Sequence, residues 1–223
     1  MPTGRELKVL LRPLLKRRPD LAFDQRMLFF RPLTHYLRGV VFISHMYTPN
    51  IALSFTTQLF DWWPDLWFEG RRGQYEYDVP MDHKEHPDEV SEALCDHLER
   101  YSLPPVESLV TPSAHEASQH YLPGRSEIDS PVYMVAKTMG ACFDGDFDQA
   151  QQLADACVDQ ETYPSQLDSP PVRIMVEMQH LLRTNRALIP SLMHEWEEAK
   201  VDALKLKKYW KRTPFPCDVA EGK

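Results

Sequence analysis

The spacing of apolar residues changes once along this chain, and that change limits the folds open to it. Ile51, Leu53 and Phe55 alternate with smaller or polar residues, which is the period of two expected for a strand with one buried face. From about Pro87 the period becomes that of a helix. The first helical stripe consists of Val90, Ala93, Leu94, His97, Leu98 and Tyr101. The chain is therefore predicted to be an α+β protein, with a sheet first and helices after it.

The segment before the strands has the pattern of an amphipathic helix. Leucines between Leu7 and Leu15 fall on one side and basic residues on the other, while Pro13 interrupts the pattern and Pro19 ends it. Three strand-like runs and a fourth candidate follow, at residues 26–33, 37–46, 51–59 and 74–79. Short connections favour antiparallel pairing. We expect an N-terminal helix on an antiparallel β-meander of three to four strands.

The second half carries helix-start signals. They are the capping pairs Ser113/Glu116 and Asp146/Gln149 and the steps Ser130-Pro131 and Ser169-Pro170. Turns near Gly145 and Asn185 predict a C-terminal helical bundle made of helical hairpins. We predict a helix plus antiparallel sheet over residues 1–82 and an acidic helical region packed on it over residues 83–223, together forming one continuous structural unit.

The charge of the chain is unevenly distributed. Residues 1–72 carry 11 Lys/Arg and 6 Asp/Glu, residues 73–200 carry 8 and 24, and residues 201–223 carry 6 and 3. The middle segment repels nucleic acid and attracts basic surfaces, and the basic ends could equally fold back onto it. We therefore expect a protein partner with a basic surface rather than a nucleic acid, and a homo-oligomer stays open.

Targeting and cysteine patterns point to the cytoplasm. No run approaches the ~18 apolar residues of a membrane span, and the charged N-terminus lacks the pattern of a signal peptide. The four cysteines are far apart in sequence and are expected to be buried free thiols. They are Cys95, Cys142, Cys157 and Cys217.

Two histidine pairs have spacings that invite comparison with metal sites. His115 and His120 are five residues apart, so a regular helix would separate their imidazoles by about 140°. His83 and His86 lie in an acidic stretch where a loop could fold both imidazoles around one ion. A polar connecting loop has the same composition, so we predict no metal site. His83 and His86 are the candidate ligands in the alternative.

Other catalytic patterns fail on specific residues. Asp144, Asp146 and Asp148 resemble the start of a calcium loop, but Gln149 and Asp155 stand where glycine and glutamate are required. The eight glycines form neither a phosphate-binding loop nor a nucleophile elbow. We predict no cofactor and no catalytic residue.

An aromatic and basic cluster is the candidate partner-binding site. It consists of Trp62, Trp63, Trp67, Arg71 and Arg72, residue types that are enriched at binding hot spots. The alternative is that the tryptophans close the edge of the sheet. The basic and aromatic stretch 205–212 could contact nucleic acid or form the solvated end of a helix, and the acidity of the chain favours the helix end.

The order of these features resembles bacterial domain-of-unknown-function proteins that are encoded beside polymorphic toxins as immunity proteins. The resemblance is carried by the Leu7–Leu15 helix, the strands over 27–33 and 40–59, and the segment Tyr101–Leu109. The group has a glycine–phenylalanine pair where this chain has Ala22-Phe23. The resemblance implies a protein that binds a partner and has no catalysis of its own.

We therefore favour a non-catalytic protein-interaction protein, such as an immunity-type neutraliser that binds a basic partner surface. A metal-dependent hydrolase using the His83/His86 loop is the first alternative. A structural subunit of a larger assembly is the second.

Overall fold

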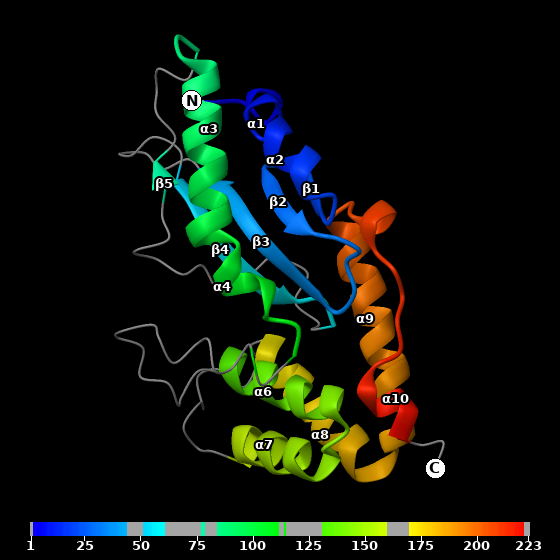
Figure 1. The fold of residues 1–223 in the computed structure, drawn as a ribbon. Helices are drawn as coiled ribbons and strands as arrows, with labels where there is room; N and C mark the ends of the chain where they lie inside the picture. The colour runs from blue at the N-terminus through cyan, green and yellow to red at the C-terminus, as the bar shows by residue number, and fades with distance from the viewer. Residues whose placement is uncertain are drawn as a thin grey trace. The chain divides into compact units, whose positions relative to one another are not determined.

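A computed structural model describes residues 2–43, 51–60, 77–78, 84–111, 114, 131–159 and 170–220 (Figure 1). It confirms the predicted α+β class, with a short N-terminal helix, an antiparallel sheet and C-terminal helices. The chain forms two compact units. Unit 1 comprises Met1–Gln58, Leu66–Val110 and Tyr209–Lys211, and unit 2 comprises the remainder.

The sheet of unit 1 has five strands in the order β1 to β5, and each neighbouring pair is antiparallel. The strands are β1 (Leu21–Asp24), β2 (Met27–Phe30), β3 (Tyr36–Ile43), β4 (Ile51–Gln58) and β5 (Tyr77–Asp78). Their order confirms the predicted meander. Strand β1 was not predicted: the first expected strand began at residue 26.

The turn between β1 and β2 explains why this hairpin was missed. Gln25 and Arg26 form the two-residue connection with φ values of 47° and 66°, and such turns normally contain asparagine or glycine. The Arg26 side chain compensates by donating from Nε to the Phe42 carbonyl at 2.9 Å, while the Phe42 N–H donates to the Arg26 carbonyl at 2.9 Å. Bonds to β3 therefore hold a turn that its own residues disfavour.

Close approach of two strands makes Gly39 necessary. Gly39 on β3 lies opposite Phe29 on β2, and a Cβ at this position would lie 2.7 Å from the Phe29 Cα. Because the obstacle is backbone, no side-chain rotation relieves it.

Helices pack beside the sheet in the described part of unit 1. They are α1 (Gly4–Leu10), α2 (Arg12–Arg17), α3 (Pro87–His97), which continues as a π turn over Leu98–Ser102, and α4 (Pro104–Glu107). Helix α1 lies beside α3, α2 contacts α3 and β1, and α4 contacts β3 and β4 (Figure 1). Residues 84–110 thus belong to unit 1, whereas the sequence placed the boundary at residue 82.

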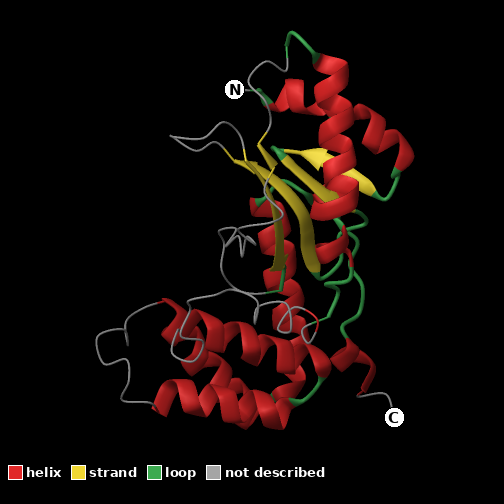
Figure 2. Cartoon of the chain, turned by 60° about the vertical axis from the view of Figure 1, so that its left-hand side comes forward, coloured by secondary structure: helices red, strands yellow, loops and turns green. Residues whose placement is uncertain are grey.

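Unit 2 is helical (Figure 2). Its helices are α6 (Pro131–Asp144), α7 (Phe147–Asp159), α8 (Pro170–Thr184), α9 (Ile189–Ala203) and α10 (Pro216–Ala220). The α6–α7 turn lies where predicted, and Asp146 caps α7 by accepting from the Gln149 N–H at 3.0 Å. A 3-10 turn at Arg186–Leu188 leads from α8 to α9, as the prediction near Asn185 requires.

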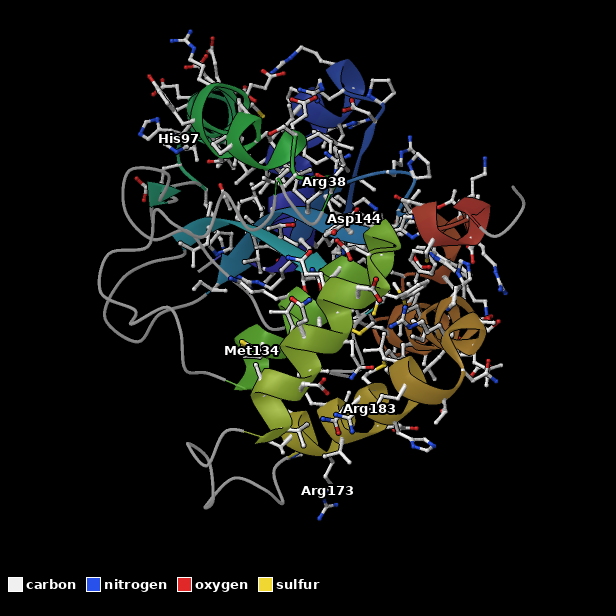
Figure 3. The ribbon with its side chains drawn as sticks, turned by 90° about the horizontal axis from the view of Figure 1, so that it is seen from below. Arg38, His97, Met134, Asp144, Arg173 and Arg183 are labelled. Atoms are coloured by element: carbon white, nitrogen blue, oxygen red, sulfur yellow. The ribbon has the colours of Figure 1, made fainter. Side chains whose placement is uncertain are left out.

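Polar and aromatic contacts hold these helices together. Asp155 on α7 accepts from Gln179 at 2.8 Å and from Arg183 at 2.6 Å, both on α8. Arg183 is labelled in Figure 3. The rings of Phe60, Phe143 and Phe215 pack with centroids 5.1–5.6 Å apart. In the described ranges, no helix has both the length and the apolar character needed to cross a membrane.

Replacing Gly39 tests the strand packing. We expect Gly39→Ala to lower the free energy of unfolding by about 2–3 kcal/mol, since the new methyl group meets fixed backbone. Gly4→Ala is the matched control, because a Cβ there would lie 3.8 Å from the Arg26 Cγ. Urea unfolding that gives equal stability for the two variants would contradict the close approach.

Candidate functional site

The structure places few of the residues that the sequence singled out. Trp62, Trp63, Trp67, Arg71 and Arg72 lie outside the described residues, as do His83, His115, His120, Ser113 and Glu116. His86 is described: it is exposed and directly precedes α3. Within the described ranges, no three His, Cys, Asp or Glu side chains are grouped to hold a metal ion.

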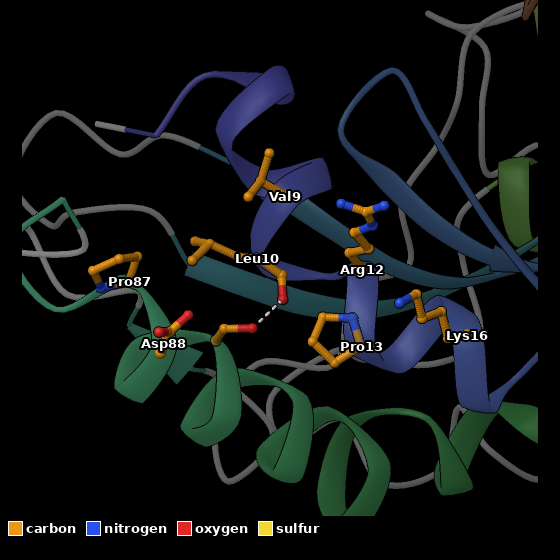
Figure 4. Close-up of a pocket in the computed structure, with 8 residues that line it drawn as sticks. Val9, Leu10, Arg12, Pro13, Lys16, Pro87 and Asp88 are labelled. Atoms are coloured by element: carbon orange, nitrogen blue, oxygen red, sulfur yellow. Dashed lines mark hydrogen bonds between the residues drawn. The ribbon is translucent and has the colours of Figure 1, made fainter.

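A groove between the α1–α2 segment and α3 is the site that the structure offers instead (Figure 4). It has a volume of about 440 Å³ and lies within unit 1. Its lining residues are Val9, Leu10, Arg12, Pro13, Lys16, Pro87, Asp88 and Ser91. We call it the α1–α3 groove.

The break between α1 and α2 determines the floor of the groove. Pro13 lies in the first turn of α2 and has no N–H to continue the hydrogen-bond ladder of α1. The Leu10 carbonyl at the end of α1 accepts from the Ser91 hydroxyl at 2.6 Å, drawn as a dashed line in Figure 4. It also accepts from the Cys95 thiol at 3.5 Å. Two polar side chains of α3 are thereby satisfied by backbone of the broken helix.

Ion pairs join α1 and α2 to the segment that contains α3, one toward each end of that segment. Glu6 Oε1 lies 3.2 Å from Lys84 Nζ, and Arg17 donates to Glu99 at 2.6 Å. The Thr3 N–H and then the Lys84 ammonium lower the pKa of Glu6 from 4.5 to about 2. Glu6 and Thr3 also form the capping box of α1, so one carboxylate caps the helix and tethers the segment before α3.

The two walls of the groove carry opposite charge. Arg12 and Lys16 stand on α2, and Asp88 stands on α3 (Figure 4). Glu89 and Glu92 follow Asp88 on the same helix and are exposed, although neither lines the groove. Within the described residues, none of these five side chains forms an ion pair with another described group.

The polar groups at the floor are arranged for packing rather than for reaction. Burial raises the pKa of the Cys95 thiol, which disfavours the thiolate that a nucleophile requires. The Ser91 hydroxyl is engaged with the Leu10 carbonyl. The groove can therefore bind apolar and charged groups, and its floor offers them no activated nucleophile.

A buried charged cluster in unit 2 is a second feature that the sequence did not reveal. His194 Nε2 lies 3.0 Å from Asp218 Oδ2, which also accepts from the Phe215 N–H at 2.7 Å. His194 Nδ1 lies 3.6 Å from Glu197 Oε2, and Lys200 is buried on the same helix. The His194 ring packs on Phe215, so the cluster fastens α10 to α9.

Sequence patterns contained the elements of the groove but not their pairing. The basic side of the first helix and the acidic start of α3 are both readable from the sequence. The contact between Leu10 and Ser91, which lies 81 residues later, cannot be read from the sequence. No protein-family model, no curated protein and no solved structure matches the chain.

Removing the Ser91 hydroxyl tests the floor. We expect Ser91→Ala to lower the free energy of unfolding by about 1–2 kcal/mol, because a buried hydrogen bond is lost. Ser108→Ala removes an exposed hydroxyl and should leave stability unchanged in the same urea titration. Equal effects of the two substitutions would count against the Ser91–Leu10 bond.

Acid titration tests the Glu6 contacts. Because folding depresses the pKa of Glu6, its stabilising effect is complete above the unfolded pKa and is lost as the pH falls towards about 2. The stability of the wild type should therefore fall more steeply than that of Glu6→Gln between about pH 5 and pH 2. Glu92→Gln should retain the wild-type slope. Parallel curves for wild type and Glu6→Gln would refute the coupling.

Proposed function

We propose that this chain is a non-catalytic protein-interaction protein whose α1–α3 groove binds a basic, amphipathic segment of a partner protein. The observation that carries the proposal is a groove with apolar lining residues and charged side chains that form no ion pair with other described residues. Such charges keep their full electrostatic attraction for a partner.

The apolar residues of the groove support contact with a row of apolar side chains on the partner. Val9 is 64% exposed although it is apolar and follows the buried Leu7 on α1. Pro13 and Pro87 line the same groove and lose no backbone donor when a partner covers them. A volume of about 440 Å³ accommodates a few apolar side chains.

The charged walls favour one orientation of the partner. Asp88, Glu89 and Glu92 stand at the start of the acidic stretch 73–200 and would face basic residues. Arg12 and Lys16 on the opposite wall would face carboxylates. A segment with an apolar row, basic residues on one side and carboxylates on the other fits this arrangement, and the reverse orientation juxtaposes like charges.

In the immunity-type form of this proposal, the bound chain covers the surface of the partner and thereby neutralises it. The four cysteines are buried and unpaired as disulfides, which supports a role in a reducing compartment such as the cytoplasm.

Amide substitutions test the acidic wall. Asp88→Asn/Glu89→Gln/Glu92→Gln removes three charges and keeps the side-chain shapes. In quantitative pull-downs from the native host at low salt, we expect the wild type to capture one or a few basic proteins. The captured amount of these proteins should fall about tenfold or more with this variant.

The matched control is Asp144→Asn/Glu177→Gln/Glu195→Gln, which removes three exposed charges in unit 2. It should capture the same proteins as the wild type, and added salt should weaken capture by both. Capture that is equal for both triple variants, or no capture by the wild type, would defeat the proposal.

A further inference from the structure

A short segment near the C-terminus forms part of unit 1. Tyr209–Lys211 belong to unit 1, whereas the residues on either side of them belong to unit 2. The Leu33 N–H donates to the Tyr209 carbonyl at 2.8 Å, and the Lys211 N–H donates to the Leu33 carbonyl at 2.8 Å. Trp210 thereby forms a parallel bridge with Leu33. We call Tyr209–Lys211 the strap. The expectation that residues 205–212 form the solvated end of a helix is wrong, because α9 ends at Ala203 and only a 3-10 turn at Lys207–Tyr209 follows it within this stretch.

One side chain gives this backbone pairing its selectivity. The Tyr209 ring packs edge-on against Phe29, with centroids 5.1 Å apart. Its hydroxyl lies 3.3 Å from Asp24 Oδ2. Strands β1 and β2 therefore supply an aromatic surface and an acceptor that fit a tyrosine one residue before the bridge.

The strap has the features of a ligand that can be exchanged. Its bonds to Leu33 use only backbone groups, from Tyr209 at the end of a 3-10 turn and from Lys211, so another peptide chain could supply the same groups, as in other cases of strand addition. The buried Trp210 Nε1 meets no acceptor in the described part of the chain, so this contact is incompletely satisfied. Leu33 is buried, and the two residues before it, Arg31 and Pro32, are exposed.

We propose that the chain around Leu33 is a peptide-binding site for an extended segment that carries a tyrosine, and that the strap is its resident occupant. A partner segment would pair in parallel with Leu33, place its tyrosine against Phe29 and Asp24, and displace Tyr209–Lys211. This site is separate from the α1–α3 groove and does not depend on the proposed function.

Binding in trans tests the inference on the full chain. The probe is a fluorescent peptide with the sequence of residues 205–214, and the control peptide carries alanine in place of Tyr209. Lys211→Pro removes the N–H that donates to the Leu33 carbonyl and should bind the probe at least about tenfold more tightly than the wild type in fluorescence anisotropy at physiological salt. Lys211→Ala removes the same charge but keeps the N–H, and should behave as the wild type.

The control peptide separates selective pairing from attraction between a basic peptide and an acidic protein. It should bind Lys211→Pro at least about tenfold more weakly than the probe, since both peptides carry the same charge. Tyr209→Ala is a second opened variant, should Lys211→Pro not fold, and it should also gain probe binding. A folded opened variant that binds neither peptide, or binds both equally, would overturn the proposal.

Discussion

The packing of unit 1 depends on one interruption of a helix. Pro13 ends the regular hydrogen bonding between α1 and α2, and α3 meets the chain at that point through Ser91 and the Leu10 carbonyl. Because Leu7, Leu11 and Leu14 on the broken helix are buried, the backbone step and the apolar stripe together position α1 and α2. The groove above this contact is a consequence of the break, since its floor includes Leu10 and Pro13 themselves.

The charged residues around the groove fall into two groups, those that pair across the segments of unit 1 and those that form no ion pair with a described residue. Glu6, Lys84, Arg17 and Glu99 pair across the two segments and hold them in place. Asp88 and Lys16 lie in the groove between these pairs without joining them. The same segment of chain thus has charges committed to its own packing and charges that pair with no described residue. This difference supports the groove, rather than the buried His194 cluster, as the proposed binding surface.

Local patterns predicted much of the fold, and long-range pairing accounts for what they missed. The alternation over residues 51–59 and the cap at Asp146 are properties of a few neighbouring residues, and both β4 and the α6–α7 turn lie where expected. Strand β1 was missed because Gln25 and Arg26 are poor turn residues that Phe42 stabilises from another strand. The strap and the groove join residues far apart in sequence, such as Leu33 and Trp210, and no local period reports such contacts. The predicted aromatic site at Trp62–Arg72 stays a prediction.

Site-specific photo-crosslinking is the most direct test of the groove as a binding surface. A photo-reactive amino acid at Val9 places the reactive group in the exposed part of the groove, and the same residue at Val176, which is 47% exposed in unit 2, serves as the control. Illumination in the native host should give a discrete adduct with a protein partner from position 9 but not from position 176. The position 9 adduct should be lost when Asp88, Glu89 and Glu92 are converted to amides. No adduct at position 9, or the same adducts from both positions, would contradict the account.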